Sequence, residues 1–446
     1  MRFCVYFMLK LKTGHTVAAC FAGSATQAII NNFAPLLFVT FNHTYGISLS
    51  LIGAMITVNF GIQLLVDLLS TKFADKIGYR PLIVTAHVMA AAGLVLLSVL
   101  PEVLPAPAAG LFIAAAVYAV GGGLIEVLVS PIVEACPYPN KKSMMSLLHS
   151  FYCWGQVGVV ALSTLFFVVA GIGNWRILAC VWAAVPALNA LLFAFVPMYK
   201  LNEEGGGMTV GGLLKSKMFW LFAVLMICAG SGEIAVSQWA SAFAEEGLGV
   251  SKTVGDLLGP CLFAVFMGAS RVLLSKFGER VKINTVLLAG SAGCIAGYCL
   301  CAFSPVAGLG LAGCAVVGFS VGVMWPGTLS YASARLPKGG TAMFALLALA
   351  GDVGCSVGPS AVGALADVFG GDLRTGIAFG LAFPVFMFLV LLVYRVGRRR
   401  RAVQGSGISE NGGAIIENAD ITAENTAAER GDAAAESVRS SSPKEE

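Results

Sequence analysis

Long apolar runs, repeated along most of the chain, restrict this protein to a membrane fold. Apolar residues make up 57% of the 446 residues and charged residues only 12%, about half the roughly 25% of a soluble globular chain. So few charges cannot cover a water-exposed surface, which excludes a soluble multidomain protein. A helix needs about 20 apolar residues to cross the bilayer. The sequence predicts twelve such helices, at residues 16–41, 50–70, 81–100, 108–134, 144–170, 176–197, 217–243, 254–275, 282–303, 306–332, 341–366 and 375–396.

The longest break between these helices divides them into two sets of six. It covers residues 198–216 and contains two glutamates followed by three glycines. We therefore expect an N-terminal six-helix bundle at 16–197 and a C-terminal one at 217–396. Residues 1–15 are interpreted as a cytoplasmic leader because their apolar run is short and no cleavage site follows. Residues 397–446 are rich in Ala, Glu, Ser and Gly and are predicted to form a disordered cytoplasmic tail.

Basic residues predict the orientation of the chain. If both termini and the even-numbered loops are cytoplasmic, that side carries twenty-two Lys and Arg residues up to Arg401. The opposite side carries only Arg176, Lys252 and Arg374. Cytoplasmic loops are enriched in Lys and Arg, so the sequence predicts a multi-pass protein of the plasma (inner) membrane with both termini inside.

An internal repeat supports the division into halves. Asp75-Lys76-Ile77-Gly78-Tyr79-Arg80 follows the second helix, and Ser275-Lys276-Phe277-Gly278-Glu279-Arg280 follows the eighth. Lys, Gly and Arg recur at the same spacing in the matching loop of each half. Two related bundles with a site between them at mid-membrane are the architecture of rocking transporters.

These motifs resemble those of a known family. Asp75, Gly78 and Arg80 resemble the loop signature of the major facilitator superfamily, although Ser275 replaces the Asp in the second copy. Within it, the chain resembles the fucose:proton symporter group of sugar permeases. The matching segments are Gly123–Pro131, His149–Phe151 and Trp325–Ser330. The resemblance covers residues 16–396. It implies an all-α fold of twelve transmembrane helices in two pseudo-repeated bundles, secondary transport and no cofactor.

Glu126 is the first polar residue that needs an explanation, because a charge at mid-bilayer costs about 2.5–3.5 kcal/mol on insertion scales. Tyr118, Gly122, Glu126 and Ser130 recur every four residues and share one helix face. Such a face either lines a cavity or binds neighbouring helices. The resemblance implies a role for Glu126 in proton coupling.

The fifth helix carries His149, Tyr152 and Gln156 on one face. His149 is interpreted either as a cavity-lining residue or as a hydrogen-bonded bundle residue, and an imidazole near a carboxyl can also pass a proton. The resemblance implies that this position faces sugar. On the seventh helix, Glu233 could be structural or could line the site, and Trp239 and Trp325 are candidates for stacking on a sugar ring.

Asn31 and Asn32 interrupt the first helix and resemble an Asn-Asn pair in the sugar permeases. That family then has an Asp required for coupling, but Pro35 occupies its position here. Asp352, in a Gly-rich segment, is interpreted as a satisfied packing residue. Four charged residues near the cytoplasmic helix ends are interpreted as gate or inter-helix ion pairs: Asp67, Asp75, Arg80 and Arg271. The predicted gate motif in the repeated loops comprises Asp75, Gly78, Arg80, Lys276, Gly278 and Arg280.

Several functions are excluded. No Walker loop, HExxH or nucleophile motif occurs, so the sequence predicts neither ATP-driven transport nor an enzyme. The twelve Cys do not have the spacing of metal ligands, and the basic residues do not cluster into a patch that could bind nucleic acid.

The leading prediction is proton-coupled uptake of a neutral monosaccharide or polyol by a monomer, with export of an amphipathic drug or metabolite as the alternative. A non-transporting membrane sensor is a third class. The predicted substrate site comprises Asn31, Asn32, Glu126, His149, Tyr152, Gln156, Glu233, Trp239 and Trp325, and the predicted proton carriers are Glu126 and His149.

Overall fold

The computed structural model describes residues 11–138, 141–199, 208–277 and 281–405. Within these ranges, the side chains of residues 71–75, 141–143, 146, 149, 341 and 398–405 lie outside the description. The described residues are helical and contain no strand. The chain divides into two compact units, Met1–Leu389 and Val390–Glu446.

The helices alternate in direction along the chain. The first half contains α2 (Thr13–Asn32), the 3-10 helix η1 (Ala34–Leu37), α3 (Phe38–Tyr45), α4 (Leu49–Ile77), α5 (Tyr79–Val103), α6 (Pro107–Ala135), α7 (Lys141–Ala170), η2 (Ile172–Asn174) and α8 (Trp175–Phe195). The second half contains α9 (Val210–Leu214), α10 (Lys217–Ala242), the π-helix η3 (Phe243–Gly247), α11 (Lys252–Asp256), the π-helix η4 (Leu257–Cys261), α12 (Leu262–Phe277), α13 (Ile283–Phe303), α14 (Ala307–Val321), α15 (Met324–Arg335), α16 (Gly340–Val368), α17 (Leu373–Gly380) and α18 (Ala382–Gly405).

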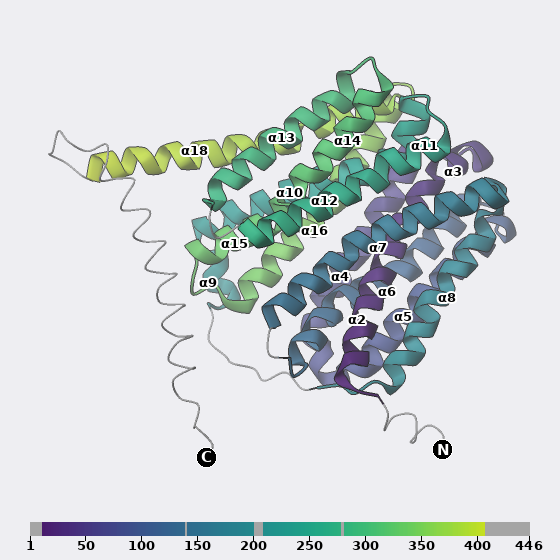
Figure 1. The fold of residues 1–446 in the computed structure, drawn as a ribbon, viewed down its shortest axis with the longest axis horizontal. Coiled ribbons are helices and arrows are strands. Elements are labelled where there is room, and N and C mark those ends of the chain that lie inside the picture. The colour runs from purple at the N-terminus through teal and green to yellow at the C-terminus, as the bar shows by residue number, and fades with distance from the viewer. Residues whose placement is uncertain (1–10, 139–140, 200–207, 278–280, 406–446) are drawn as a thin grey trace. The chain divides into compact units, whose positions relative to one another are not determined.

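The twelve-helix fold predicted from hydropathy is confirmed. Among the described residues, eleven helical stretches are long and apolar enough to cross a membrane. The twelfth span consists of α2, η1 and α3. It is less apolar than the other eleven because α2 carries Gln27, Asn31 and Asn32. In Figure 1 the helices of the first half (purple to blue) lie beside those of the second half (teal to green).

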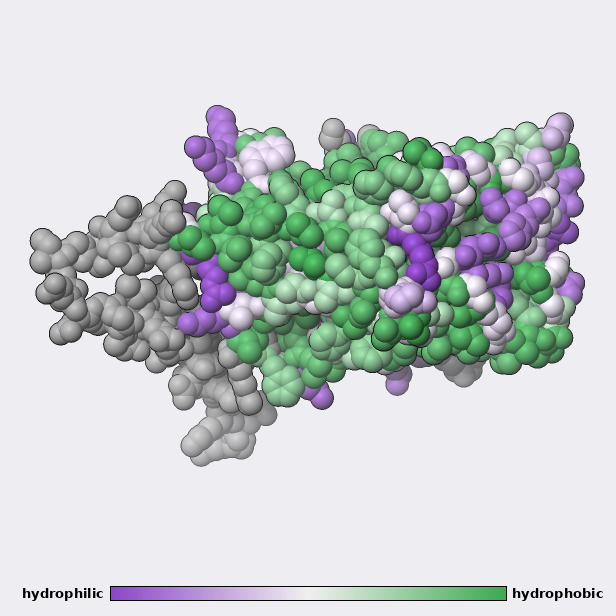
Figure 2. Space-filling model, turned by 90° about the horizontal axis from the view of Figure 1, so that it is seen from above, coloured by the Kyte–Doolittle hydropathy of each residue, from purple (hydrophilic) through white to green (hydrophobic). Residues whose placement is uncertain are grey.

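Large apolar side chains cover much of the outer surface, as lipid contact requires. Val169 is 80% exposed and Leu188 is 67% exposed. On the face shown in Figure 2, hydrophobic residues cover the middle and hydrophilic residues gather toward the right-hand side. A surface of this kind is stable only against hydrocarbon.

The bundle has two ends, which we name by a residue at each. The His43 end contains the connections that follow α3, α5, α10, α13 and α16. The Gly78 end contains those that follow α4, α6, α8, α12 and α15. Gly78 has a φ of 92° at the start of α5, a conformation that favours glycine.

The first span breaks at Pro35. Proline has no N–H, so the carbonyl four residues earlier, that of Asn31, loses its helical hydrogen bond. The side chain of Gln238 in α10 donates to this carbonyl instead, at 2.9 Å. A break in the first half is therefore stabilised by a side chain from the second half.

The C-terminal boundary differs from the prediction. Helix α18 continues to Gly405, although disorder was expected from residue 397. The added residues include Arg, Ala and Gln, which are good helix formers, and the described part of the helix reaches Gly405. Residues 406–446 lie outside the described part of the chain, and the other predicted domain boundaries stay predictions.

Glycines allow α10 and α16 to pack at backbone contact. A Cβ atom on Gly354 of α16 would lie 2.2 Å from the carbonyl oxygen of Ile227 in α10, and one on Gly230 would lie 2.2 Å from that of Gly351. Small residues at such crossings let helix backbones approach closely in membranes.

This contact generates a stability prediction. Gly354→Ala is expected to force α16 away from α10 and to destabilise the protein by about 1–3 kcal/mol, as overpacking does. Gly61→Ala in α4 is the matched control, because no atom lies within 4 Å of its added Cβ. Melting temperatures in detergent check both variants, and equal values would contradict the packing argument.

Candidate functional site

Five polar side chains from three helices form a hydrogen-bonded network inside the first half. Gln27 of α2 donates to Glu126 of α6 at 2.8 Å and to Gln63 of α4 at 2.9 Å. Gln63 donates to Asn59 and to Asn31, both at 3.0 Å, and Asn59 donates to Asn31 at 3.2 Å. Four of the five members are amides, and all four are buried. An apolar bundle has no need of such a network for packing alone.

Glu126 is exposed, unlike the amides that contact it. Its neighbour Ile125 is buried, and a Cβ atom on Gly122, one turn earlier, would touch Gln27 and Gln63. Glu126 thus points toward the centre of the bundle rather than toward lipid. Its exposed surface is therefore turned toward neighbouring helices.

Helix α7 borders the same network. Tyr152 is half-buried on α7, which packs against α2 where a Cβ atom on Gly155 would lie 2.9 Å from that of Ala28. Gln156 is 2% exposed, and its side-chain nitrogen has no hydrogen-bond partner among the described residues. A buried amide donor without a partner is costly, so this group is suited to a ligand or to water. The side chain of His149 lies outside the described residues.

The second half contributes an ion pair. Glu233 of α10 lies 3.5 Å from the guanidinium of Arg271 in α12. Arg271 also donates to the sulfur of Cys153 in α7 at 3.4 Å, so it contacts both halves. Arg271 forms the inter-helix ion pair predicted for it, and its partner is a predicted site residue.

The two tryptophans predicted to stack on a sugar both pack against other helices of the protein, and their contact with a sugar stays a prediction. Trp239 is completely buried, donates to the carbonyl of Pro359 at 2.8 Å and packs against Phe38 with ring centroids 5.4 Å apart. Trp325 packs against α16, where a Cβ atom on Gly351 would lie 2.3 Å from its ring. Hydropathy could not reveal these contacts, because they depend on how neighbouring helices pack.

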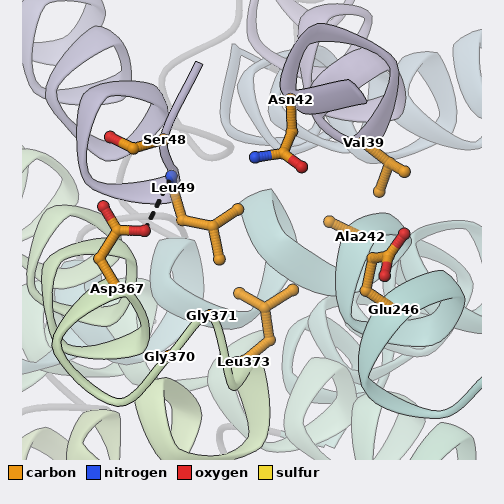
Figure 3. Close-up of a pocket in the computed structure, with 10 residues that line it drawn as sticks. All are labelled: Val39, Asn42, Ser48, Leu49, Ala242, Glu246, Asp367, Gly370, Gly371 and Leu373. Carbon is orange, nitrogen blue, oxygen red and sulfur yellow. Dashed lines mark hydrogen bonds between the residues drawn. The ribbon is translucent and has the colours of Figure 1, made fainter. Parts of the chain in front are cut away.

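Contacts between the halves close the His43 end. Asp367 of α16 accepts hydrogen bonds from the backbone N–H groups of Leu49 (3.1 Å) and Ser50 (2.7 Å) and so caps α4 across the interface. His43 lies 3.3 Å from Glu246. Beside these contacts is a cavity of about 490 Å³. Figure 3 shows Asp367 and Glu246 on opposite sides of it.

A buried acid completes this closure. Asp256 of α11 is fully buried and lies 2.9 Å from the ammonium of Lys252. Thr164 of α7 donates to Asp256 at 3.3 Å, and Ser241 of α10 also donates to it. One carboxylate therefore joins three helices from the two halves.

The repeated loop motif is described only in part. Arg80 donates to the carbonyls of Ala194 and Val196 and caps the end of α8. Lys276 is exposed at the end of α12. The side chain of Asp75 lies outside the described residues, as do Gly278 and Arg280.

The sequence reasoning missed Gln27, Asn59, Gln63 and Asp256. A signal for three of them was present, because Gln27 and Asn31 are spaced four residues apart, as are Asn59 and Gln63. Polar pairs at that spacing share a helix face. Within the described part of the chain, no group of three or more His, Cys, Asp or Glu side chains could hold a metal.

The chain is similar to known transporters. A family model described as the Major Facilitator Superfamily matches residues 19–359. No curated protein matches the chain. Among solved structures it is similar to the nucleoside transporter NupG, with a TM-score of 0.69, 13% identity, and coverage of 85% of this chain and 99% of that one.

It is also similar to the Escherichia coli fucose:proton symporter FucP, with a TM-score of 0.59, 15% identity, and coverage of 84% of this chain and 97% of that one. A FucP structure described as outward in conformation gives the same values. At such low identities these likenesses concern the fold alone.

The ion pair generates a prediction. Arg271→Gln leaves the carboxylate of Glu233 without its cation, and breaking a buried pair costs about 3–5 kcal/mol. Because this pair is partly exposed, we expect the free energy of unfolding to fall by about 3 kcal/mol or less. Adding Glu233→Gln should restore most of the melting temperature. Lys282→Gln, at an exposed position, is the charge-matched control and should change nothing. Equal melting of Arg271→Gln and the control would exclude a stabilising pair.

Proposed function

The chain belongs to the Major Facilitator Superfamily and is a multi-pass membrane transporter, and from this premise we propose that it takes up a small neutral polyhydroxylated solute. The solute is a monosaccharide or a related polyol. Transport occurs across the plasma membrane by alternating access and is coupled to a proton. The protein works as a monomer, since one chain of this fold contains a whole pathway.

The amide network around Glu126 carries this proposal. The amides of Gln27, Asn31, Asn59 and Gln63 place donors and acceptors beside an exposed carboxyl. Sugar hydroxyls both donate and accept, and amides match them in both roles. The unpaired Gln156 nitrogen and the equally unpaired side-chain oxygen of Gln27 are ready partners. Export of an amphipathic drug would be served by an apolar lining, which this network does not provide.

Glu126 is the proposed proton carrier. Its only hydrogen-bond donor among the described residues is the neutral amide of Gln27. Burial in a closed bundle disfavours the charged form of a carboxyl, so a proton should accompany closure around the site. One proton that moves down about 100 mV contributes about 2.3 kcal/mol. That is enough to concentrate a neutral solute about fifty-fold.

Glu126→Gln separates coupling from binding. The amide still accepts from Gln27 but cannot release a proton. In proteoliposomes the variant should lose gradient-driven accumulation, a drop of about fifty-fold at 100 mV. It should keep exchange at equal solute concentrations. The measurement is uptake of labelled sugars, polyols and nucleosides with and without an imposed pH gradient.

Glu134→Gln, on the same helix, is the matched control and should accumulate solute normally. Accumulation by Glu126→Gln under a pH gradient would exclude Glu126 as the carrier. A panel in which no hydroxylated solute is transported would overturn the proposed substrate class.

The Gly78 end is proposed to be cytoplasmic, because most of the basic residues lie there. In a cysteine-free background, a Cys at Ala106, exposed at the His43 end, should react with an impermeant thiol reagent added to intact cells. A Cys at Lys338, exposed at the Gly78 end, should react only after the cells are opened. The reverse pattern would invert the topology and the direction of transport.

A further inference from the structure

An apolar groove runs between α5 and α8 on the outer surface of the first half. Figure 1 shows these two helices side by side at the edge of the bundle that lies away from the second half. The groove has a volume of about 580 Å³, and its lining residues lie between Val84 and Val95 in α5 and between Cys180 and Ala194 in α8. That volume is within the range of ligand pockets, about 300–1,000 Å³.

Small side chains create the groove. Seven of its twelve lining residues are alanines and the other five are valine, leucine or cysteine, so the lining has no charged, amide or hydroxyl side chain. Larger side chains stand beside it on α8, where Leu188 and Val181 are both more than half exposed. The lining residues Ala184 and Ala187 are exposed. The groove therefore opens toward hydrocarbon and fits a flexible apolar chain.

The groove is long enough for an acyl chain. A helix rises 1.5 Å per residue, so the distance along α8 from Cys180 to Ala194 is about 21 Å. One leaflet contributes about half of the roughly 30 Å of hydrocarbon in a bilayer. The groove is thus longer than one leaflet is deep, and a lipid acyl chain can lie in it along its whole length.

A cation lies at the Gly78 end of the groove. Arg80 precedes Val84 by one turn of α5, and its guanidinium donates to the carbonyls of Ala194 and Val196 at the end of α8. These bonds use two of the five N–H donors of a guanidinium. No carboxylate of the described residues forms an ion pair with Arg80. Arg80 is half-buried, so it places a positive charge at the mouth of an apolar groove.

We propose that the α5–α8 groove binds one anionic phospholipid, with an acyl chain along the alanines and the phosphate at Arg80. A guanidinium binds phosphate through its planar set of N–H donors. Basic pockets between transmembrane helices on the cytoplasmic side suit anionic headgroups, and the Gly78 end is the one that we assign to the cytoplasm. The lipid contacts α5 and α8 together and therefore stabilises the folded protein. The site does not depend on the transported solute, because it faces lipid rather than the interior.

Native mass spectrometry of the full-length protein tests this site with two lipids of identical acyl chains, phosphatidylglycerol and phosphatidylcholine. The first bound lipid should favour the anionic phosphatidylglycerol about fivefold, the ratio expected for one basic residue near the headgroup. Arg80→Gln should make the two lipids bind equally. Ala187→Phe fills the groove with a ring and should lower the occupancy of both lipids.

Ala296→Phe is the matched control. Ala296 is also an exposed alanine, but it lies on α13 and outside the groove, so this variant should bind both lipids as the parent does. Arg80 also caps α8, so Ala187→Phe, which leaves that cap intact, decides the outcome if Arg80→Gln does not fold. Occupancy in Ala187→Phe equal to that of the parent would overturn the site, as would a preference for phosphatidylglycerol that persists in Arg80→Gln.

Two further outcomes would assign the groove to another occupant and overturn the proposal. Glycerol phosphate carries the charge of the headgroup without acyl chains and should not displace the lipid. Displacement by glycerol phosphate would identify a site for free anions at Arg80. A dimer of the parent that Ala187→Phe dissociates would show that a second copy of the chain covers the groove.

Discussion

The need to satisfy every backbone polar group away from water shapes this fold most directly at Pro35. A carbonyl left without a partner in hydrocarbon costs several kcal/mol, and Pro35 leaves that of Asn31 without its helical bond. Gln238 supplies the missing donor from the other half of the protein. The break in the first span and the contact between the halves thus depend on each other. If the halves part at this level, the carbonyl needs another donor, which water or a bound solute can provide.

Close packing of small residues determines where the halves can move. Gly354 and Gly230 bring α16 and α10 to backbone contact within the second half, and such a contact resists sliding because any shift creates overlap. The halves also make a close contact at the His43 end, where a Cβ atom on Gly363 of α16 would lie 2.7 Å from the carbonyl oxygen of Leu49 in α4. A cross-interface helix cap by Asp367 and polar contacts to Asp256 accompany it. The polar contacts can be exchanged for water at moderate cost.

Hydropathy alone predicted the twelve spans, because the bilayer imposes one length and one polarity on each of them. The periodicity of α6 also placed Glu126 on the interior face. The partners of these residues were not predictable in the same way. Gln27 reaches Glu126 and Trp239 donates to Pro359 only because of the rotation of each helix and the way neighbouring helices pack. A single helix pattern contains no information about that packing, so the polar faces could be predicted and the pairs between them could not.

The distribution of charge in this interior suits the neutral solute that we propose. The one cation near the network among the described residues, Arg271, is already balanced by Glu233, and Glu126 meets only neutral amides there. With Glu126 protonated, the network carries no net charge and can close around an uncharged molecule without desolvating an ion. An anionic solute would meet an ionised Glu126 as a like charge and find no free cation to replace its water. A cation would pair with Glu126 and displace its proton. The charge distribution therefore fits the neutral, hydrogen-bonding solute that we propose, because such a solute leaves the carboxyl free to take up and release a proton.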